Sequence, residues 1–150
     1  MKKLDMENLV IGSTSSGKGQ DFSVLLKIQL EGRKNLIVID PLNELENLYP
    51  IKEKQGYRIL RYSLETNVLQ QVKTDLLNPI KEKVLIHVSF PKDFRNSKGN
   101  TSHLVIEFLR IVKELQGGEW RKSDSLEIFL FEYQVYASSH LNDLLKLWKV

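Results

Sequence analysis

The eight residues from Gly12 to Gly19 constrain the fold of this chain more than any other segment. They read Gly-Ser-Thr-Ser-Ser-Gly-Lys-Gly, and the apolar run Leu9–Ile11 precedes them. Apolar residues at helical spacing follow, so the order is strand, glycine-rich turn, lysine and helix, as in a phosphate-binding loop. Backbone N–H groups in such a loop converge on an anion, and the helix dipole adds positive charge. The segment predicts that a nucleotide's phosphates are bound by Gly12, Ser13, Thr14, Ser15, Ser16, Gly17, Lys18 and Gly19.

This loop departs from the usual pattern at one position. The residue after the lysine is usually Ser or Thr, whose hydroxyl binds Mg²⁺, and here it is Gly19. Metal must then be held by water, by phosphate oxygens or by another side chain. The alternative interpretation of the whole segment is a Ser/Gly-rich turn with an exposed lysine.

Composition indicates an ordinary globular protein. A length of 150 residues suits one domain, residues 1–150, and the chain has 41 % hydrophobic and 27 % charged residues. The absence of cysteine excludes disulfides and thiolate metal sites, and it fits a reducing, cytoplasmic setting. We expect no transmembrane segment, because no apolar run approaches ~20 residues, and the N-terminus is too polar for a signal peptide. A net charge of +3 permits nucleic acid as a partner without arguing strongly for it.

Apolar runs alternate with helical periodicity along the chain, which predicts an α/β fold. We expect a P-loop NTPase-like, mainly parallel sheet with helices on both faces. Strands are predicted at residues 9–11, 36–39, 57–62, 84–90 and 126–131, with 57–62 at an edge of the sheet. Helices are predicted at 17–31, 43–54 (interrupted at Pro50), 69–77, 101–115 and 141–148, with an exposed loop at 92–100.

Four polar or turn residues follow predicted strands directly: Gly12, Asp40, Pro91 and Glu132. Ligands of parallel sheets bind beyond the carboxyl ends of the strands, so we expect these residues along one rim. Asp40 is the candidate metal residue, touching Mg²⁺ or its water, and its alternative role is a turn or helix cap before Pro41. Glu132 is the candidate catalytic base, and its alternative is a carboxylate facing solvent at a strand end.

Four segments together resemble the type IV coupling proteins, the DNA-transfer ATPases of bacterial conjugation and type IV secretion. In that family the lysine of the loop is often followed by glycine, as it is at Gly19. A later strand of the family ends in Asp-Pro-Lys-Gly-Glu, where this chain has Asp-Pro-Leu-Asn-Glu at residues 40–44. The other two segments are 56–60 with 77–80, and 84–91 with 126–132. The family motor is much longer, with membrane helices and an inserted helical domain, so the chain resembles a shortened or degenerate relative.

The resemblance implies the ligands ATP and Mg²⁺, with Lys18 on the β- and γ-phosphates and Glu132 positioning water. The family has Asp before that glutamate, and this chain has Phe131, so we expect weak or absent hydrolysis. The implied partners are DNA, secretion-system proteins and further copies of the chain in a ring. The implied location is the bacterial cytoplasm, at the inner face of the membrane through partners.

Two other functions stay open. A small P-loop nucleotide or metabolite kinase would need an acceptor site and an arginine-rich lid, for which Arg95, Arg110 and Arg121 are the candidates. A non-catalytic interaction protein that retains the fold is favoured by the missing aspartate. The three histidines share no metal-ligand spacing, and His87, within an apolar strand, is expected to be a satisfied core histidine.

Overall fold

The computed structural model describes residues 9–11, 25–65, 67–77, 83–92, 98–115 and 126–148. The predicted loop residues Gly12–Gly19 therefore lie outside the described part of the chain. Within it, five strands form one sheet in the order β1-β5-β2-β4-β3, and every neighbouring pair is parallel. The strands are β1 (Leu9–Ile11), β2 (Asn35–Ile39), β3 (Tyr57–Ser63), β4 (Lys83–Ser89) and β5 (Leu126–Leu130). The predicted parallel sheet is confirmed, and so is the edge position of β3.

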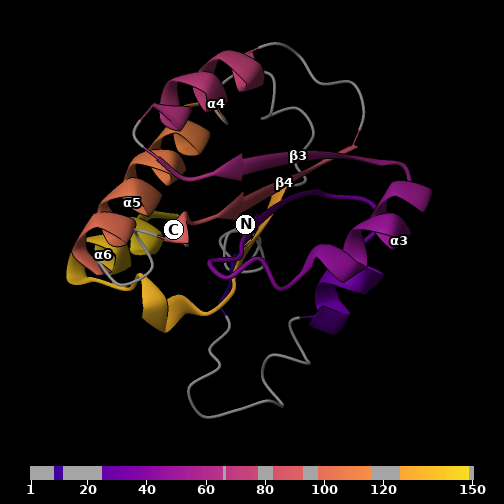
Figure 1. Ribbon diagram of the computed structural model, residues 1–150, viewed down its shortest axis with the longest axis horizontal. Coiled ribbons are helices and arrows are strands. Elements are labelled where there is room, and N and C mark those ends of the chain that lie inside the picture. The colour runs from indigo at the N-terminus through magenta and orange to yellow at the C-terminus, as the bar shows by residue number, and fades with distance from the viewer. Residues whose placement is uncertain are drawn as a thin grey trace.

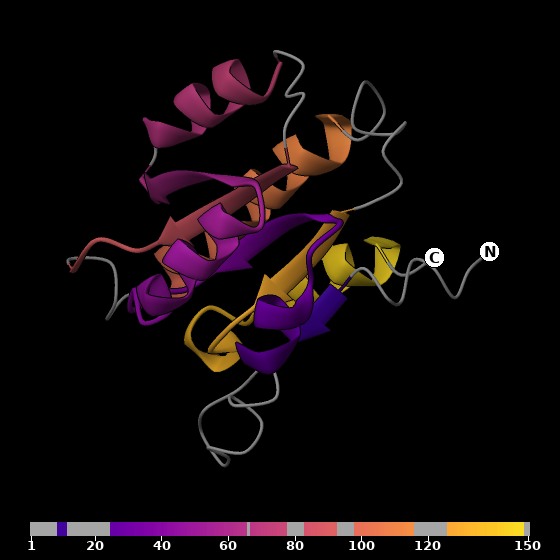
Figure 2. The same ribbon diagram turned by 90° about the vertical axis from the view of Figure 1, so that its right-hand side faces the viewer.

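Helices cover both faces of this sheet, as predicted (Figures 1 and 2). One face carries α4 (Val68–Leu77), α5 (Lys98–Leu115) and α6 (Ser139–Trp148). The other face carries the helical residues 25–30 and α3 (Tyr49–Lys54), which follows the short 3₁₀ turn η1 (Glu46–Leu48). A second 3₁₀ turn, η4 (Tyr133–Val135), follows β5.

The central strand β2 shows why the chain folds into three layers. Its sequence Asn-Leu-Ile-Val-Ile is apolar after the first residue, and those four residues are fully buried. Side chains alternate between the two faces of a strand. Ile37 and Ile39 accordingly pack in the cluster that includes α4, α5 and α6, whereas Leu36 and Val38 pack with Ile28 and α3. A continuous apolar run is what a strand buried on both faces requires.

Two boundaries differ from the sequence-based expectation. The helix expected at 43–54 begins only at Tyr49, after the 3₁₀ turn η1. Pro50 lies in its first turn and does not interrupt it, because first-turn N–H groups need no intrahelical acceptor. Helix α5 begins at Lys98, so residues 98–100 are helical and the expected loop at 92–100 is too long. Residues 17–24 of the first predicted helix lie outside the described residues. Among the described residues, no helix combines the length and apolar character needed to cross a membrane.

Candidate functional site

The carboxyl ends of the five strands lie abreast at one edge of the sheet. Ile11 of β1 is in register with Leu130 of β5, and Leu130 is in register with Ile39 of β2. Ile39 pairs in turn with Val88 of β4. Asp40, Glu132 and Pro91 follow β2, β5 and β4 at this edge, which we call the carboxyl edge.

Asp40 is fully buried and closes the turn that follows β2. Its Oδ2 atom accepts hydrogen bonds from the backbone N–H of Leu45 at 2.8 Å and from Nε2 of His87 at 3.0 Å. Its backbone carbonyl accepts from the N–H of Asn43 at 3.1 Å. These contacts match the alternative role given above for Asp40, a turn residue before Pro41. The second carboxylate oxygen, Oδ1, is buried and has no hydrogen-bond partner among the described residues.

His87 is a satisfied core histidine, as predicted, and belongs to a polar network beside Asp40. Only 2 % of its surface is exposed. Its Nδ1 atom lies 3.8 Å from Oε2 of Glu46, which in turn pairs with Nε of Arg61 at 3.1 Å. The Tyr49 ring packs edge-on against the imidazole with centroids 5.1 Å apart. Across the described residues, no three His, Asp or Glu side chains are grouped to hold a metal ion directly.

Glu132 is buried, with 6 % of its surface exposed, so the expectation of a solvent-facing carboxylate is wrong. Its backbone is left-handed, with φ 55° and ψ 47°, an unusual conformation for a residue other than glycine. The turn holds it there, because its carbonyl accepts from the N–H of Val135 at 3.0 Å. Its Oε1 atom accepts from Nε2 of Gln134 at 3.2 Å. The chain therefore turns back at Glu132 and keeps the carboxylate against the protein.

The charges of both candidate carboxylates act on one buried tyrosine, Tyr136. Burial first, and then the charges of Tyr133, Asp40 and Glu132, raise the pKa of Tyr136 well above its usual value. The Tyr136 hydroxyl donates to the carbonyl of Phe131 at 2.9 Å, and its ring contacts Phe90. Asp40 and Glu132 thus act on the same side chain, at the ends of neighbouring strands. The two acidic residues selected from the sequence thus follow adjacent strands at the same edge of the sheet.

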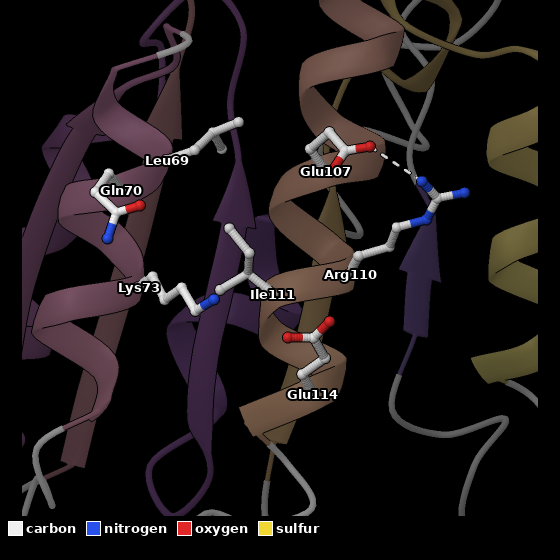
Figure 3. Close-up of a pocket in the computed structure, with 7 residues that line it drawn as sticks. All are labelled: Leu69, Gln70, Lys73, Glu107, Arg110, Ile111 and Glu114. Atoms are coloured by element: carbon white, nitrogen blue, oxygen red, sulfur yellow. Dashed lines mark hydrogen bonds and ion pairs between the residues drawn. The ribbon is translucent and has the colours of Figure 1, made fainter.

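A separate open groove of about 350 Å³ lies between α4 and α5 (Figure 3). Its lining includes both basic and acidic side chains, and Nη1 of Arg110 pairs with Oε1 of Glu107 at 3.0 Å. Neither Asp40 nor Glu132 lines it. The groove is lined by Leu69, Gln70, Lys73, Glu107, Arg110, Ile111 and Glu114. Arg110, a candidate lid residue for the kinase interpretation, therefore belongs to a surface ion pair of α5.

One buried and one half-buried lysine at the opposite, amino-terminal edge of the sheet were not expected from the sequence. Lys52 is fully buried, and its ammonium group donates to the carbonyls of Ile28, at 2.5 Å, and Glu31. Lys83 donates to the carbonyls of Gly32 and Gln55, each at 2.6 Å. Both ammonium groups lie 4.8 Å from the centre of the Tyr57 ring. Lys52 thus joins α3 to the end of the helix at residues 25–30, and Lys83 ties the chain after each of these helices to β4. No periodicity in the sequence marks either lysine.

No family model, curated protein or solved structure matches this chain. The resemblance to coupling ATPases therefore stays a prediction carried by the segments named above.

Proposed function

We propose that this protein binds ATP at the carboxyl edge, with the polyphosphate held by residues Gly12–Gly19 and neutralised by Lys18. The observation that carries the proposal is the strand register. Gly12 directly follows Ile11, which pairs with Leu130, and Leu130 pairs with Ile39. The glycine-rich sequence thus follows β1, which pairs with the strand that leads to Glu132, and the strand that leads to Asp40 is the next one along the sheet. Parallel sheets bind ligands at this edge.

One atom at this edge, Oδ1 of Asp40, is a suitable ligand for Mg²⁺ or for one of its waters. When bound, it would neutralise charge on the β- and γ-phosphates. Asp40 offers Oδ1, a buried oxygen without a hydrogen-bond partner among the described residues, and carboxylate oxygens suit this ion. Gly19 and Phe131 carry no oxygen in their side chains, so Asp40 is the proposed contact, directly or through water.

Slow or absent hydrolysis is part of the proposal. Glu132, the proposed base, already accepts a hydrogen bond from Gln134 and is buried in a tight turn. To attack the γ-phosphate, a water would need space beside the Glu132 carboxylate. It would also need a metal ion that more than one protein group holds in place. We therefore propose nucleotide binding as the main property and regard ATP hydrolysis as weak.

The resemblance to coupling ATPases supports a wider role in moving DNA or protein through a secretion channel. The proposed partners are DNA, secretion-system proteins and further copies of this chain, at the inner face of a bacterial membrane. Phosphate release that DNA stimulates would support this role. Phosphate transfer to a small acceptor would support the kinase instead, and binding without turnover would support a non-catalytic protein.

Replacing Lys18 with alanine is expected to weaken ATP affinity by about tenfold or more, equivalent to about 1.4 kcal/mol. The loss of the ammonium group removes a full charge from the terminal phosphates. Isothermal titration calorimetry measures the effect. The matched control is Lys54→Ala, an exposed lysine in the last turn of α3, which should bind ATP as the wild type does. Equal affinities for Lys18→Ala and wild type would refute the role of Lys18.

A further inference from the structure

The hydrogen bonds to Asp40 are unevenly shared between its two carboxylate oxygens. Both donors, the N–H of Leu45 and Nε2 of His87, bind Oδ2. Oδ1 is buried without a partner among the described residues, although an ionised carboxylate has about four acceptor positions. Leaving a buried acceptor unsatisfied is unfavourable. A donor or cation that reaches this oxygen would therefore be stabilised by it.

His87 is itself held on several sides. Its strand is paired on both edges, with Val38 of β2 and Arg61 of β3 in register with it. Glu46 faces Nδ1, and Tyr49 packs against the ring. The N–H of Asp40 donates to the carbonyl of Val88, the residue after His87, at 2.7 Å. The imidazole and the carboxylate are thus fixed relative to each other by backbone as well as side-chain contacts.

We infer that His87 is a positioning residue for the metal of the bound nucleotide. By donating to Oδ2, His87 sets the rotation of the Asp40 carboxylate and leaves Oδ1 to accept a hydrogen bond from a water of the nucleotide's Mg²⁺. Mg²⁺ keeps several of its waters in proteins, so an indirect contact suits it. The inference rests on the proposed function, and it supplies the contact that Gly19 and Phe131 lack.

The test is the gain in ATP affinity that Mg²⁺ produces, measured by calorimetry with Mg²⁺ and with EDTA. We expect a gain of roughly fivefold or more in the wild type and of less than about twofold in His87→Phe, which keeps a ring but has no donor. His87→Gln restores the gain, because its amide N–H₂ group donates to Oδ2. Affinity in EDTA should be the same in all three. His103→Phe, at an exposed position of α5, is the matched control and should keep the full gain.

Each outcome decides a different question. Failure of the wild type to bind ATP under either condition contradicts the proposed function. A folded His87→Phe variant with the full gain, or a His87→Gln variant without it, overturns the inference and leaves the pair as a turn-stabilising contact. Should His87→Phe lose its near-ultraviolet circular dichroism, Asp40→Asn replaces it as the test variant. A full Mg²⁺ gain in Asp40→Asn also overturns the inference.

Discussion

Replacing Lys52 with alanine is expected to lower the free energy of unfolding by about 3 kcal/mol. The ammonium group is the donor to two backbone carbonyls, that of Ile28 in a buried bond and that of Glu31 in a half-buried one, and a carbonyl left buried without a donor costs about 1–3 kcal/mol. The apolar stem of the lysine is lost as well. Urea denaturation with an unchanged slope would measure the effect.

Lys54→Ala is the matched control for this variant. It removes the same side chain two residues along α3, from an exposed position, and should change the free energy of unfolding by less than about 0.5 kcal/mol. Lys52→Met keeps most of the stem without the donors and should lose most of the same stability. A loss below about 1 kcal/mol in Lys52→Ala would contradict the structural role given to the two hydrogen bonds.

Alkaline pH is expected to unfold the protein steeply above about pH 10. Burial is the main cause that raises the pKa of all five tyrosines in the chain, Tyr49, Tyr57, Tyr62, Tyr133 and Tyr136. The unfolded chain loses these protons near pH 10, whereas the folded protein keeps them. The tyrosines therefore leave stability unchanged below that pH and lower it above, by about 1.4 kcal/mol per pH unit for each tyrosine that stays protonated.

At slightly lower pH, Lys52 has the opposite effect from the tyrosines on the pH dependence of stability. Burial first, and then the charge of Lys83, lower the pKa of Lys52 to about 8, against the effect of Glu31. Between about pH 8 and about pH 10 the unfolded chain holds more protons at this site than the folded protein does, so stability rises with pH. This rise should be absent in Lys52→Ala, and the fall above it should remain.

Tyrosinate absorbance and circular dichroism, followed together, measure the alkaline transition. Ionisation and unfolding should coincide in one transition above about pH 10, because the hydroxyls ionise when the protein opens. A gradual tyrosine titration centred near pH 10 in protein that retains its circular dichroism would show that these hydroxyls are solvated, contrary to the structure.

The layers of the fold were predictable because the residue pattern within each single segment indicates a strand or a helix. The apolar runs of β2 and β4 mark strands buried on both faces, and the glycine and proline residues around them mark the connections. The edge position of β3 followed from its partial alternation, which its mixed burial confirms. Each of these inferences needs only neighbouring residues.

The candidate site was predictable only in outline, because its contacts join residues far apart in the sequence. Asp40 and Glu132 were selected from their positions after strands. The pairing of Asp40 with His87, 47 residues away, has no local signal, since it depends on which strands are neighbours. The burial of Glu132 depends on a left-handed turn, a conformation that sequence patterns assign to glycine or asparagine and not to glutamate.

The position at which ATP binds is the most direct test of the proposed nucleotide site. In an amide chemical-shift titration with ATP and Mg²⁺, we predict the largest changes at Gly12–Gly19, and further changes at Asp40, Phe90 and Glu132 of the carboxyl edge. The amides of Gly32, Gly56 and Lys83, at the opposite edge, should stay unchanged. Largest changes at the opposite edge or in the groove between α4 and α5, or no changes at saturating ATP, would contradict the proposed nucleotide site.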